Sequence, residues 1–232
     1  MQDRVKGRMD DQVPNRHGAP KAGSGDVTGK LAAIDMTGAA GLLVVKTLLG
    51  RCERCPLHRS RRHIVFGEGD PDADVMFIAE APGAEEDRQG APFVGPAGNL
   101  LTRMVEAMGL RRKDIYIANI LKCRPPSNRD PLPEEMEVCQ PFLMAQIQAI
   151  QPRIIVALGR IAAQALLETD EPLSRLRGRF HDLRGVPLMP TYHPAYLLRN
   201  AAAKRPTWED LKKIMSEMDR LGIKRNKNPP RA

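Results

Sequence analysis

The sequence predicts an α/β fold of three layers, α/β/α, around a central, mainly parallel four-stranded sheet. From residue 64 onward, short β-rich runs alternate with helical patterns, which is the βαβ signature of a parallel sheet covered on both faces. With 42% hydrophobic residues the chain can fill the core of such a domain. The predicted strands are 75–78, 115–117, 154–158 and 186–190. The predicted helices are 42–49, 100–108, 133–150 and 208–221.

The order of these patterns along the chain predicts one domain with two extensions. Residues 1–38 mix Gly, Pro, Asp and Arg without apolar periodicity, so we expect a disordered N-terminal extension. Residues 39–223 form the predicted domain, and 224–232 a basic C-terminal tail. The closing helix, 208–221, places apolar residues three and four positions apart, which indicates a stripe that faces the core.

Charge points to a polyanionic partner without naming one. The net charge is +8, and the last thirty residues hold nine basic and four acidic side chains. Arginines gather at 51–62 and at 175–184, where they would either contact phosphates or form solvated basic faces. No apolar run reaches membrane-spanning length, so we expect a soluble, cytoplasmic protein with no membrane partner.

All four cysteines fall where a metal cluster could use them. Cys52 and Cys55 are two residues apart, while Cys123 and Cys139 follow after gaps of 67 and 15 residues. The wide spacing and the proline after Cys55 favour an iron–sulfur cluster over structural zinc, which spacing alone does not exclude. Unrelated core thiols or two disulfides are the remaining alternative.

Polar side chains follow successive predicted strands at the point where each strand ends. Glu80, Asn119 and His193 come just after three of these strands, and Gly159 follows the fourth. In a parallel sheet they would meet at one edge, where open α/β folds place their ligands. Neither a P-loop nor a G-x-G-x-x-G follows any strand, which argues against an NTPase or a dehydrogenase.

Several motifs occur in a specific order between about residues 42 and 221. They are the cysteine pair, the acidic loop 80–87, the loop 92–98, Asn119 with the segment 122–126, Cys139, and the segment 192–199. In these motifs the chain resembles the uracil-DNA glycosylase superfamily, most closely its type 4, iron–sulfur branch. The resemblance implies a [4Fe-4S] cluster on Cys52, Cys55, Cys123 and Cys139.

That resemblance also implies an activity. We expect a monomeric, monofunctional DNA glycosylase that flips uracil out of DNA and hydrolyses its N-glycosidic bond, in base excision repair. The long basic insert of relatives that trap uracil-DNA covalently is missing after Asn119, so turnover is expected. Alternatives are a uracil-DNA binder with weak turnover, a glycosylase for a broader set of deaminated bases, and an electron carrier.

Residue types at the matching positions suit this chemistry. His193 is the expected donor to uracil O2, and Asn119 matches O4 and N3–H while mismatching the amine of cytosine. Phe93 is expected to stack on the flipped base, and the backbone around Ala79, Glu80 and Ala81 to close the pocket.

Two acidic side chains compete for the position next to the attacking water. We favour Glu80 as the group that positions the water, and Glu86 or Asp87 as the wall that rejects the thymine methyl. Glu85 is expected to lie in a solvated acidic turn that caps a helix.

The remaining candidates would contact DNA. The resemblance implies that Leu197 wedges into the space left by the flipped nucleotide, the alternative being a leucine buried in a helix. Phosphate contacts are expected from Lys122, Arg124 and Arg199, and Asn128 is expected near the DNA.

Overall fold

The computed structural model describes residues 27–226 and contains a six-stranded sheet in the order β1-β3-β2-β4-β6-β5. Its four inner strands run parallel, and the two short edge strands pair antiparallel. The strands are β1 (Glu68–Gly69), β2 (Val75–Ala79), β3 (Tyr116–Asn119), β4 (Ile154–Leu158), β5 (His181–Leu183) and β6 (Val186–Thr191). The predicted, mainly parallel sheet is confirmed, but its predicted count of four strands is too low, because the edge strands β1 and β5 are too short to show a pattern in the sequence.

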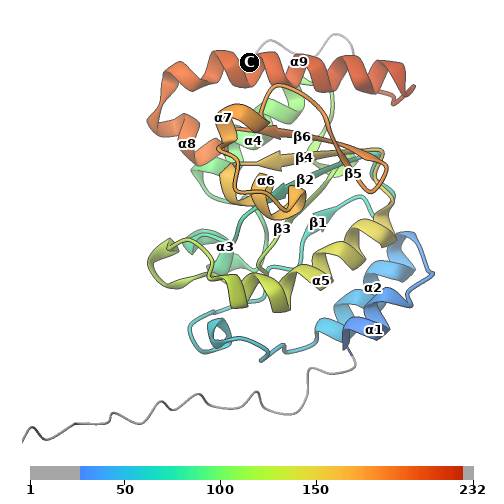
Figure 1. The fold of residues 1–232 in the computed structure, drawn as a ribbon, viewed down its shortest axis with the longest axis vertical. Coiled ribbons are helices and arrows are strands. Elements are labelled where there is room, and N and C mark those ends of the chain that lie inside the picture. Colours follow the sequence, from blue (N-terminus) through green and yellow to red (C-terminus); the bar gives the residue numbers. More distant parts are fainter. Residues whose placement is uncertain (1–26, 227–232) are drawn as a thin grey trace, which may run out of the picture.

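Helices cover both faces of this sheet (Figure 1). They are α1 (Val27–Ala32), α2 (Gly38–Leu49), α3 (Ala84–Gln89), α4 (Pro96–Ala107), α5 (Pro133–Ile150), α6 (Arg160–Leu167), α7 (Leu173–Leu176), α8 (Pro194–Arg199) and α9 (Lys204–Arg220). None of the helices within residues 27–226 is long and apolar enough to cross a membrane. The three-layer α/β/α arrangement is therefore confirmed.

Alternating side chains of the strands enter two separate cores. Val75, Phe77 and Ala79 of β2 pack against α4 and α9, whereas Met76 and Ile78 pack against α5 and α6. All five residues are buried, because a parallel sheet covered on both faces leaves neither side in water. This double burial explains why β2, β3 and β4 are apolar without alternation.

The N-terminal boundary differs from the predicted one. Residues 1–26 lie outside the described part of the chain, but Val27–Ala32 forms α1, and Leu31 and Ile34 pack with Val45 of α2 and Phe142 of α5. The expected disorder is therefore wrong for residues 27–34. A single turn of apolar spacing is too short to stand out in a Gly-rich sequence.

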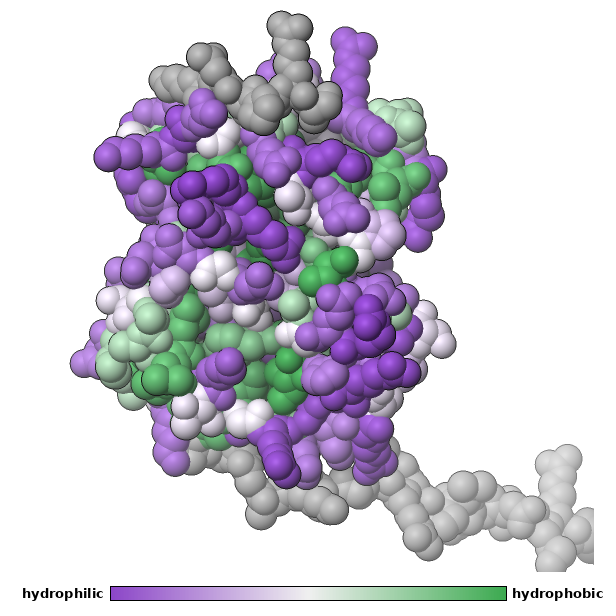
Figure 2. All heavy atoms as spheres, turned by 180° about the vertical axis from the view of Figure 1, so that it is seen from behind, coloured by the Kyte–Doolittle hydropathy of each residue, from purple (hydrophilic) through white to green (hydrophobic). Residues whose placement is uncertain are grey.

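The C-terminal region closes the opposite side of the molecule. Helix α9 lies across the sheet and is followed by a turn that ties Asn226 to Gly109 through a backbone hydrogen bond of 2.8 Å. Residues 227–232 of the expected basic tail lie outside the described residues. The face in Figure 2 is largely hydrophilic, with apolar residues in separate groups.

Candidate active site at the carboxyl ends of the strands

A cavity of about 400 Å³ lies at the carboxyl ends of the parallel strands. Glu80 follows β2, Asn119 ends β3, and His193 comes two residues after the end of β6, so the topology brings all three to one edge. The predicted convergence of a carboxyl, an amide and an imidazole is thus what the structure contains. The cavity is lined by Glu80, Ala81, Pro82, Gly83, Glu86, Phe93, Ala97, Asn119, Pro125, Asn128, Arg129, Asp130, His193, Ala195, Tyr196 and Arg199.

His193 is held as a neutral imidazole with a defined tautomer. Its Nδ1 accepts a hydrogen bond of 3.1 Å from the backbone N–H of Ala195, at the start of α8. Burial lowers the pKa of His193 to about 4, although Glu86 opposes that shift. The proton of the neutral ring therefore sits on Nε2, which becomes a donor. The partner that orients the ring is a backbone group, which no residue type in the sequence could reveal.

Asn119 lines the cavity and carries an amide oxygen without a hydrogen-bond partner. The residue is only 2% exposed, and its Oδ1 is buried without a hydrogen-bond partner. A buried amide oxygen without a partner costs about 1–3 kcal/mol, so a ligand that supplies an N–H at this point recovers that cost. The cavity therefore favours a ligand that donates an N–H to Asn119 Oδ1.

Phe93 forms a wall of the cavity in a strained backbone conformation. Its φ is +55°, its ring lies 5.5 Å from the His193 ring at 29°, and Arg112 donates to its carbonyl oxygen at 3.1 Å. A side chain at Gly98 would collide with the Phe93 carbonyl, so α4 can start close to this loop only with glycine there. The surroundings therefore hold the Phe93 ring in a stacked position against the His193 ring, inclined by 29°.

Two carboxyl groups line the cavity in different surroundings. Glu86 Oε1 accepts hydrogen bonds from the backbone N–H groups of Val94 and Gly95, at 3.0 and 3.2 Å. Burial, followed by the charge of Asp130, raises the pKa of Glu80 to about 7. Glu86 thus braces the loop before α4, whereas Glu80 can exchange a proton near neutral pH.

The other acidic residues of this loop face away from the cavity. Asp87 is buried and accepts a hydrogen bond of 2.8 Å from the backbone N–H of Arg62, so it does not reach the pocket as one alternative supposed. Glu85 is exposed and pairs with Arg88 at 2.7 Å, in keeping with the solvated turn expected for it.

Two further predicted contacts are not formed. Ala79 is fully buried, does not line the cavity, and its carbonyl accepts from the N–H of Ile120 at 2.9 Å, because β2 and β3 are still paired there. Lys122 is 1% exposed, and its Nζ donates to Asn119 O at 2.7 Å and Gln146 Oε1 at 2.6 Å. The predicted phosphate contact of Lys122 is therefore wrong. Instead it fixes the end of β3, which carries Asn119.

The predicted wedge is also buried. Leu197 is 2% exposed and belongs to the core between α4 and α9, so the alternative of a buried helical leucine is the correct one. Arg199 and Asn128 are exposed and line the cavity, and Arg124 Nε donates to Asn128 Oδ1 at 2.7 Å. Arg199 and Asn128 therefore lie at the rim, and half-buried Arg124 adjoins them through its bond to Asn128.

The sequence did not indicate four residues that line the cavity and could contact a ligand. Arg129, Asp130, Tyr196 and Ala195 all line the cavity. The first two directly follow Asn128, and the last two lie within the motif 192–199, so the signal was present as adjacency to named residues. Their direction depends on the positive φ values of Ser127 and Asn128 and on the start of α8 at Pro194, which motifs do not reveal.

The four cysteines line a second, small cavity together with Leu49, Leu57, Ile64, Leu121, Lys122 and Val138. All four are free thiols, so the alternative of two disulfides is wrong. Arg61 Nη1 approaches Cys123 Sγ at 3.3 Å, and the backbone N–H of Lys122 approaches Cys139 Sγ at 3.3 Å. Within residues 27–226, no group of three or more His, Cys, Asp or Glu is arranged to hold a metal ion.

The arginines near these cysteines bond inward rather than outward. Arg61 donates to Cys52 O at 2.7 Å, and Arg54 donates to Leu48 O at 3.2 Å and lies 5.1 Å from the ring of Phe142. They brace the loop that carries the cysteine pair, so Arg54 and Arg61 are not part of a free phosphate-binding face.

Comparison with known proteins agrees with this geometry. The family model of the uracil DNA glycosylase superfamily matches residues 66–212. The chain is 44% identical to the type-4 uracil-DNA glycosylase of Thermotoga maritima over 77% of this chain and 95% of that protein. It is 44% identical to the type-4 enzyme of Archaeoglobus fulgidus over 70% and 86%, and 32% identical to a type-5 enzyme of Thermus thermophilus over 68% and 80%. The matched residues include β2, β3, β4 and β6 and the cavity at their carboxyl ends, and the chain belongs to the uracil-DNA glycosylase superfamily.

Proposed function

We propose that this protein is a uracil-DNA glycosylase of DNA repair that releases uracil by hydrolysis. The observation that carries the proposal is that one cavity is lined both by Asn119, whose Oδ1 is buried without a partner, and by His193, whose Nδ1 accepts from the Ala195 N–H. Uracil offers N3–H to that oxygen and O2 to an imidazole donor. Membership of the superfamily and the type-4 relatives support the same activity.

Asn119 would select uracil against cytosine. Its amide gives one acceptor and one donor in a plane, which match N3–H and O4 of uracil. Cytosine carries an acceptor at N3 and an amine at C4, so both contacts would set like groups against each other. Lys122 holds the carbonyl of Asn119 and keeps the strand end fixed while the amide reads the base.

His193 would stabilise the departing base. Breaking the bond between C1′ and N1 leaves the electron pair on uracil, where the charge spreads onto O2. A neutral imidazole whose Nδ1 is already occupied by Ala195 N–H donates from Nε2 to that oxygen without giving up its proton. The low pKa of His193 keeps the ring in this form throughout the neutral range.

Glu80 would position the water that replaces the base. In its ionised form the carboxylate accepts one proton of the water while the water oxygen attacks C1′ and uracil leaves as an anion with the electron pair of the C1′–N1 bond. The proton taken up by Glu80 balances the one that the uracil anion then acquires, so the products are free uracil and an abasic site. A pKa of about 7 places half of the enzyme in this form at neutral pH. Glu86 is engaged with two backbone N–H groups, and we propose it as the wall against the methyl of thymine.

We propose that Cys52, Cys55, Cys123 and Cys139 hold a [4Fe-4S] cluster, in which each thiolate would bind a different iron atom, so the four need not converge on a single ion. These thiols share one cavity, and N–H donors from Arg61 and Lys122 point at two of the sulfurs, as is common around cluster thiolates. Burial raises the pKa of Cys123, and that of Cys139 to about 12, so a bound metal would have to stabilise their ionised form. When bound, the cluster would join the first cysteine loop to β3 and α5.

A direct test is incubation with a duplex oligonucleotide that contains one uracil, followed by alkali. Strand cleavage at the uracil is expected, with none for the same duplex carrying thymine or cytosine. An intact uracil strand, with a known glycosylase active in the same buffer, contradicts the proposal. For the cluster, iron and sulfide analysis of purified protein is expected to give four of each per chain, and Cys139→Ala to lose both.

A further inference from the structure

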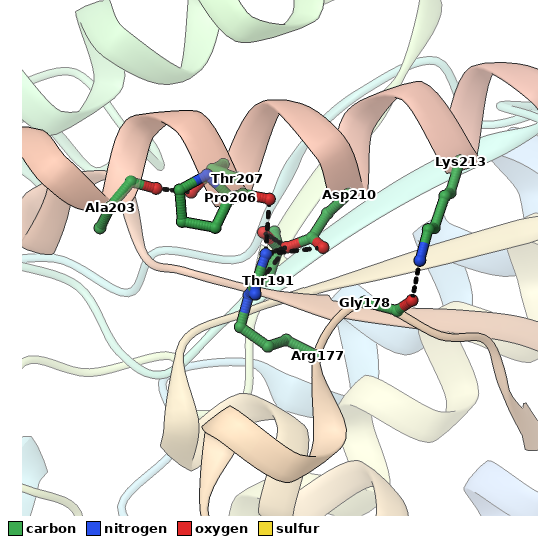
Figure 3. Close-up of polar contacts among 8 residues, drawn as sticks. All are labelled: Arg177, Gly178, Thr191, Ala203, Pro206, Thr207, Asp210 and Lys213. Atoms are coloured by element: carbon green, nitrogen blue, oxygen red, sulfur yellow. Dashed lines mark hydrogen bonds and ion pairs between the residues drawn. The ribbon is translucent and has the colours of Figure 1, made fainter.

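A buried ion pair between Asp210 and Arg177 holds Thr191 (Figure 3), and His193 follows two residues later in the chain. Asp210 of α9 is 1% exposed and accepts hydrogen bonds from Thr191 Oγ1 at 2.7 Å and from Arg177 Nη2 at 2.8 Å and Nε at 3.1 Å. Thr191 is the last residue of β6. A buried carboxylate is tolerated only when its oxygens are paired, as those of Asp210 are with Thr191 and Arg177. Through Thr191, this pairing fixes the end of β6, which leads into the active site.

From this ion pair a column of stacked groups runs to the surface. The Arg177 guanidinium lies 5.0 Å from the centre of the Tyr192 ring, and that ring stacks on Tyr196 with centroids 5.2 Å apart and planes at 24°. Asn200 Nδ2 donates to Tyr196 Oη at 2.7 Å. The Tyr196 ring is thus held by one face and by its hydroxyl.

The outer end of the column lies at the mouth of the base pocket. Tyr196 is 39% exposed and lines the cavity, whereas its neighbour Leu197 is 2% exposed and packs into the core. Leu198 is 48% exposed but does not line the cavity. Of the two exposed apolar side chains of α8, Tyr196 is therefore the one that lines the cavity.

We propose that Tyr196 is a stacking platform for a nucleobase of the duplex beside the extruded uracil. The inference rests on the proposed glycosylase function and replaces the wedge role expected of Leu197. Aromatic rings stack on any base, because every base has a π-face, and a ring that is already ordered loses little side-chain entropy on contact. The column from Asp210 through Arg177 and Tyr192 supplies that order.

The stacking role predicts a specific dependence on the substrate. In duplex DNA the bases next to uracil lose a stacking partner when it leaves, so a ring that takes its place favours extrusion. In single-stranded DNA the uracil is already free of a rigid stack, so the ring matters less. Tyr196→Ala is therefore expected to lower the ratio of kcat/KM for duplex over single-stranded uracil DNA about tenfold, in line with one lost stacking contact.

Two variants separate stacking from folding. Tyr196→Phe keeps the ring and is expected to keep the ratio within about twofold of the wild type, since a phenyl face stacks as a phenol face does. Leu198→Ala, the matched truncation two residues away, is expected to leave the ratio unchanged. Thermal unfolding temperatures of all three variants show whether the fold survives.

A spectroscopic readout reports the contact directly. A duplex with 2-aminopurine next to a uracil nucleotide carrying a 2′-fluoroarabino sugar, which resists cleavage, is bound by each protein at saturation. Stacking quenches 2-aminopurine, so the Tyr196→Ala complex is expected to fluoresce more brightly than the wild-type and Leu198→Ala complexes.

Equal losses on duplex and single-stranded DNA for Tyr196→Ala, or a selective duplex loss for Leu198→Ala instead, overturn the stacking role while leaving the glycosylase function intact. A wild-type protein that releases no uracil from either substrate overturns both. A selective duplex loss in Tyr196→Ala that Tyr196→Phe does not share, with the brighter 2-aminopurine signal, establishes the platform.

Discussion

Two cavities lie at opposite ends of the sheet. The cavity of about 400 Å³ at the carboxyl ends of the strands brings together an imidazole, an amide and a carboxyl group with a pKa of about 7. A cavity of about 880 Å³ opens beside the amino ends of β2 and β3. The larger cavity is lined by five carboxylates, Asp70, Asp72, Asp74, Glu106 and Asp114. Asp74 and Asp114 pair with arginines.

The volume of a cavity therefore does not mark the active site of this protein. Charge does not mark it either, because acidic residues outnumber basic ones in both linings. The larger cavity adds Arg111, Lys224 and Arg225 to its five acidic residues, and the smaller has Glu80, Glu86 and Asp130 with Arg129 and Arg199. Of the two cavities, the smaller is the one lined by His193 and Phe93. The smaller cavity also holds the buried, unpaired oxygen of Asn119. Variants at the two ends of the sheet test this difference.

The largest loss is expected from His193→Ser. Removing the donor to O2 takes away stabilisation of the leaving base, which is worth about 10²–10³ in kcat for one such donor. DNA affinity is expected to fall much less, because the imidazole acts on charge that develops in the transition state. Single-turnover rates and DNA binding measured on the same preparation check both; equal losses contradict the role.

Glu80→Gln is expected to lower kcat about 10²-fold and to flatten the acid limb of the pH–rate profile. In the wild type that limb should rise through about pH 7, as the carboxyl ionises and can accept a proton. Rates measured from pH 5 to pH 9 give the profile. If the acid limb of the pH–rate profile persisted in Glu80→Gln, a group other than Glu80 would position the water.

The same substitution also tests stability. Because the folded protein holds the proton of Glu80 up to about pH 7 while an exposed glutamate releases it near 4.5, the wild type should lose stability between those values as pH rises. Glu80→Gln is expected to lack that loss and to melt at a higher temperature than the wild type at pH 8. Melting curves at pH 5 and pH 8 give the comparison.

Asn119→Asp is expected to change which base is accepted. An ionised aspartate offers two acceptors and no donor, so it loses the contact to O4 and gains a partner for the cytosine amine. Uracil release should fall about 10–100-fold relative to cytosine release, or activity should vanish. Parallel assays on uracil and cytosine duplexes measure the ratio; an unchanged preference would remove Asn119 from base reading.

The smallest effect is expected from a matched pair of exposed aspartates, one at each end of the sheet. Asp130 raises the pKa of Glu80, so Asp130→Asn should shift the acid limb of the pH–rate profile to lower pH by less than about one unit. Asp72→Asn in the larger cavity should shift nothing and keep kcat/KM within about twofold. Equal shifts in both variants would erase the distinction between the two ends.

Much of the fold followed from patterns of neighbouring residues. The buried strands β2, β3, β4 and β6 are apolar runs bounded by turns, and the topology of alternating strands and helices then places Glu80, Asn119 and His193 at one edge without further information. The short edge strands β1 and β5 were not predicted, since two or three residues carry no periodicity.

Side-chain direction did not follow from the same patterns. Lys122 looked like a phosphate ligand because it is basic and follows Asn119, but Gln146, 24 residues away, accepts from it inside the core. Leu197 and Tyr196 are adjacent, and only the angle at which α8 packs on α4 decides that the leucine is buried and the tyrosine faces the pocket.

By itself, the sequence determined the layered fold, the residues at the strand ends and the family, because these depend on hydrophobic spacing and on the order of motifs. Only the tertiary structure decided the states of those residues: the tautomer of His193, the proton affinity of Glu80, the unpaired oxygen of Asn119 and the exposure of Tyr196. Each of these depends on desolvation and hydrogen bonding by groups that other parts of the chain bring close.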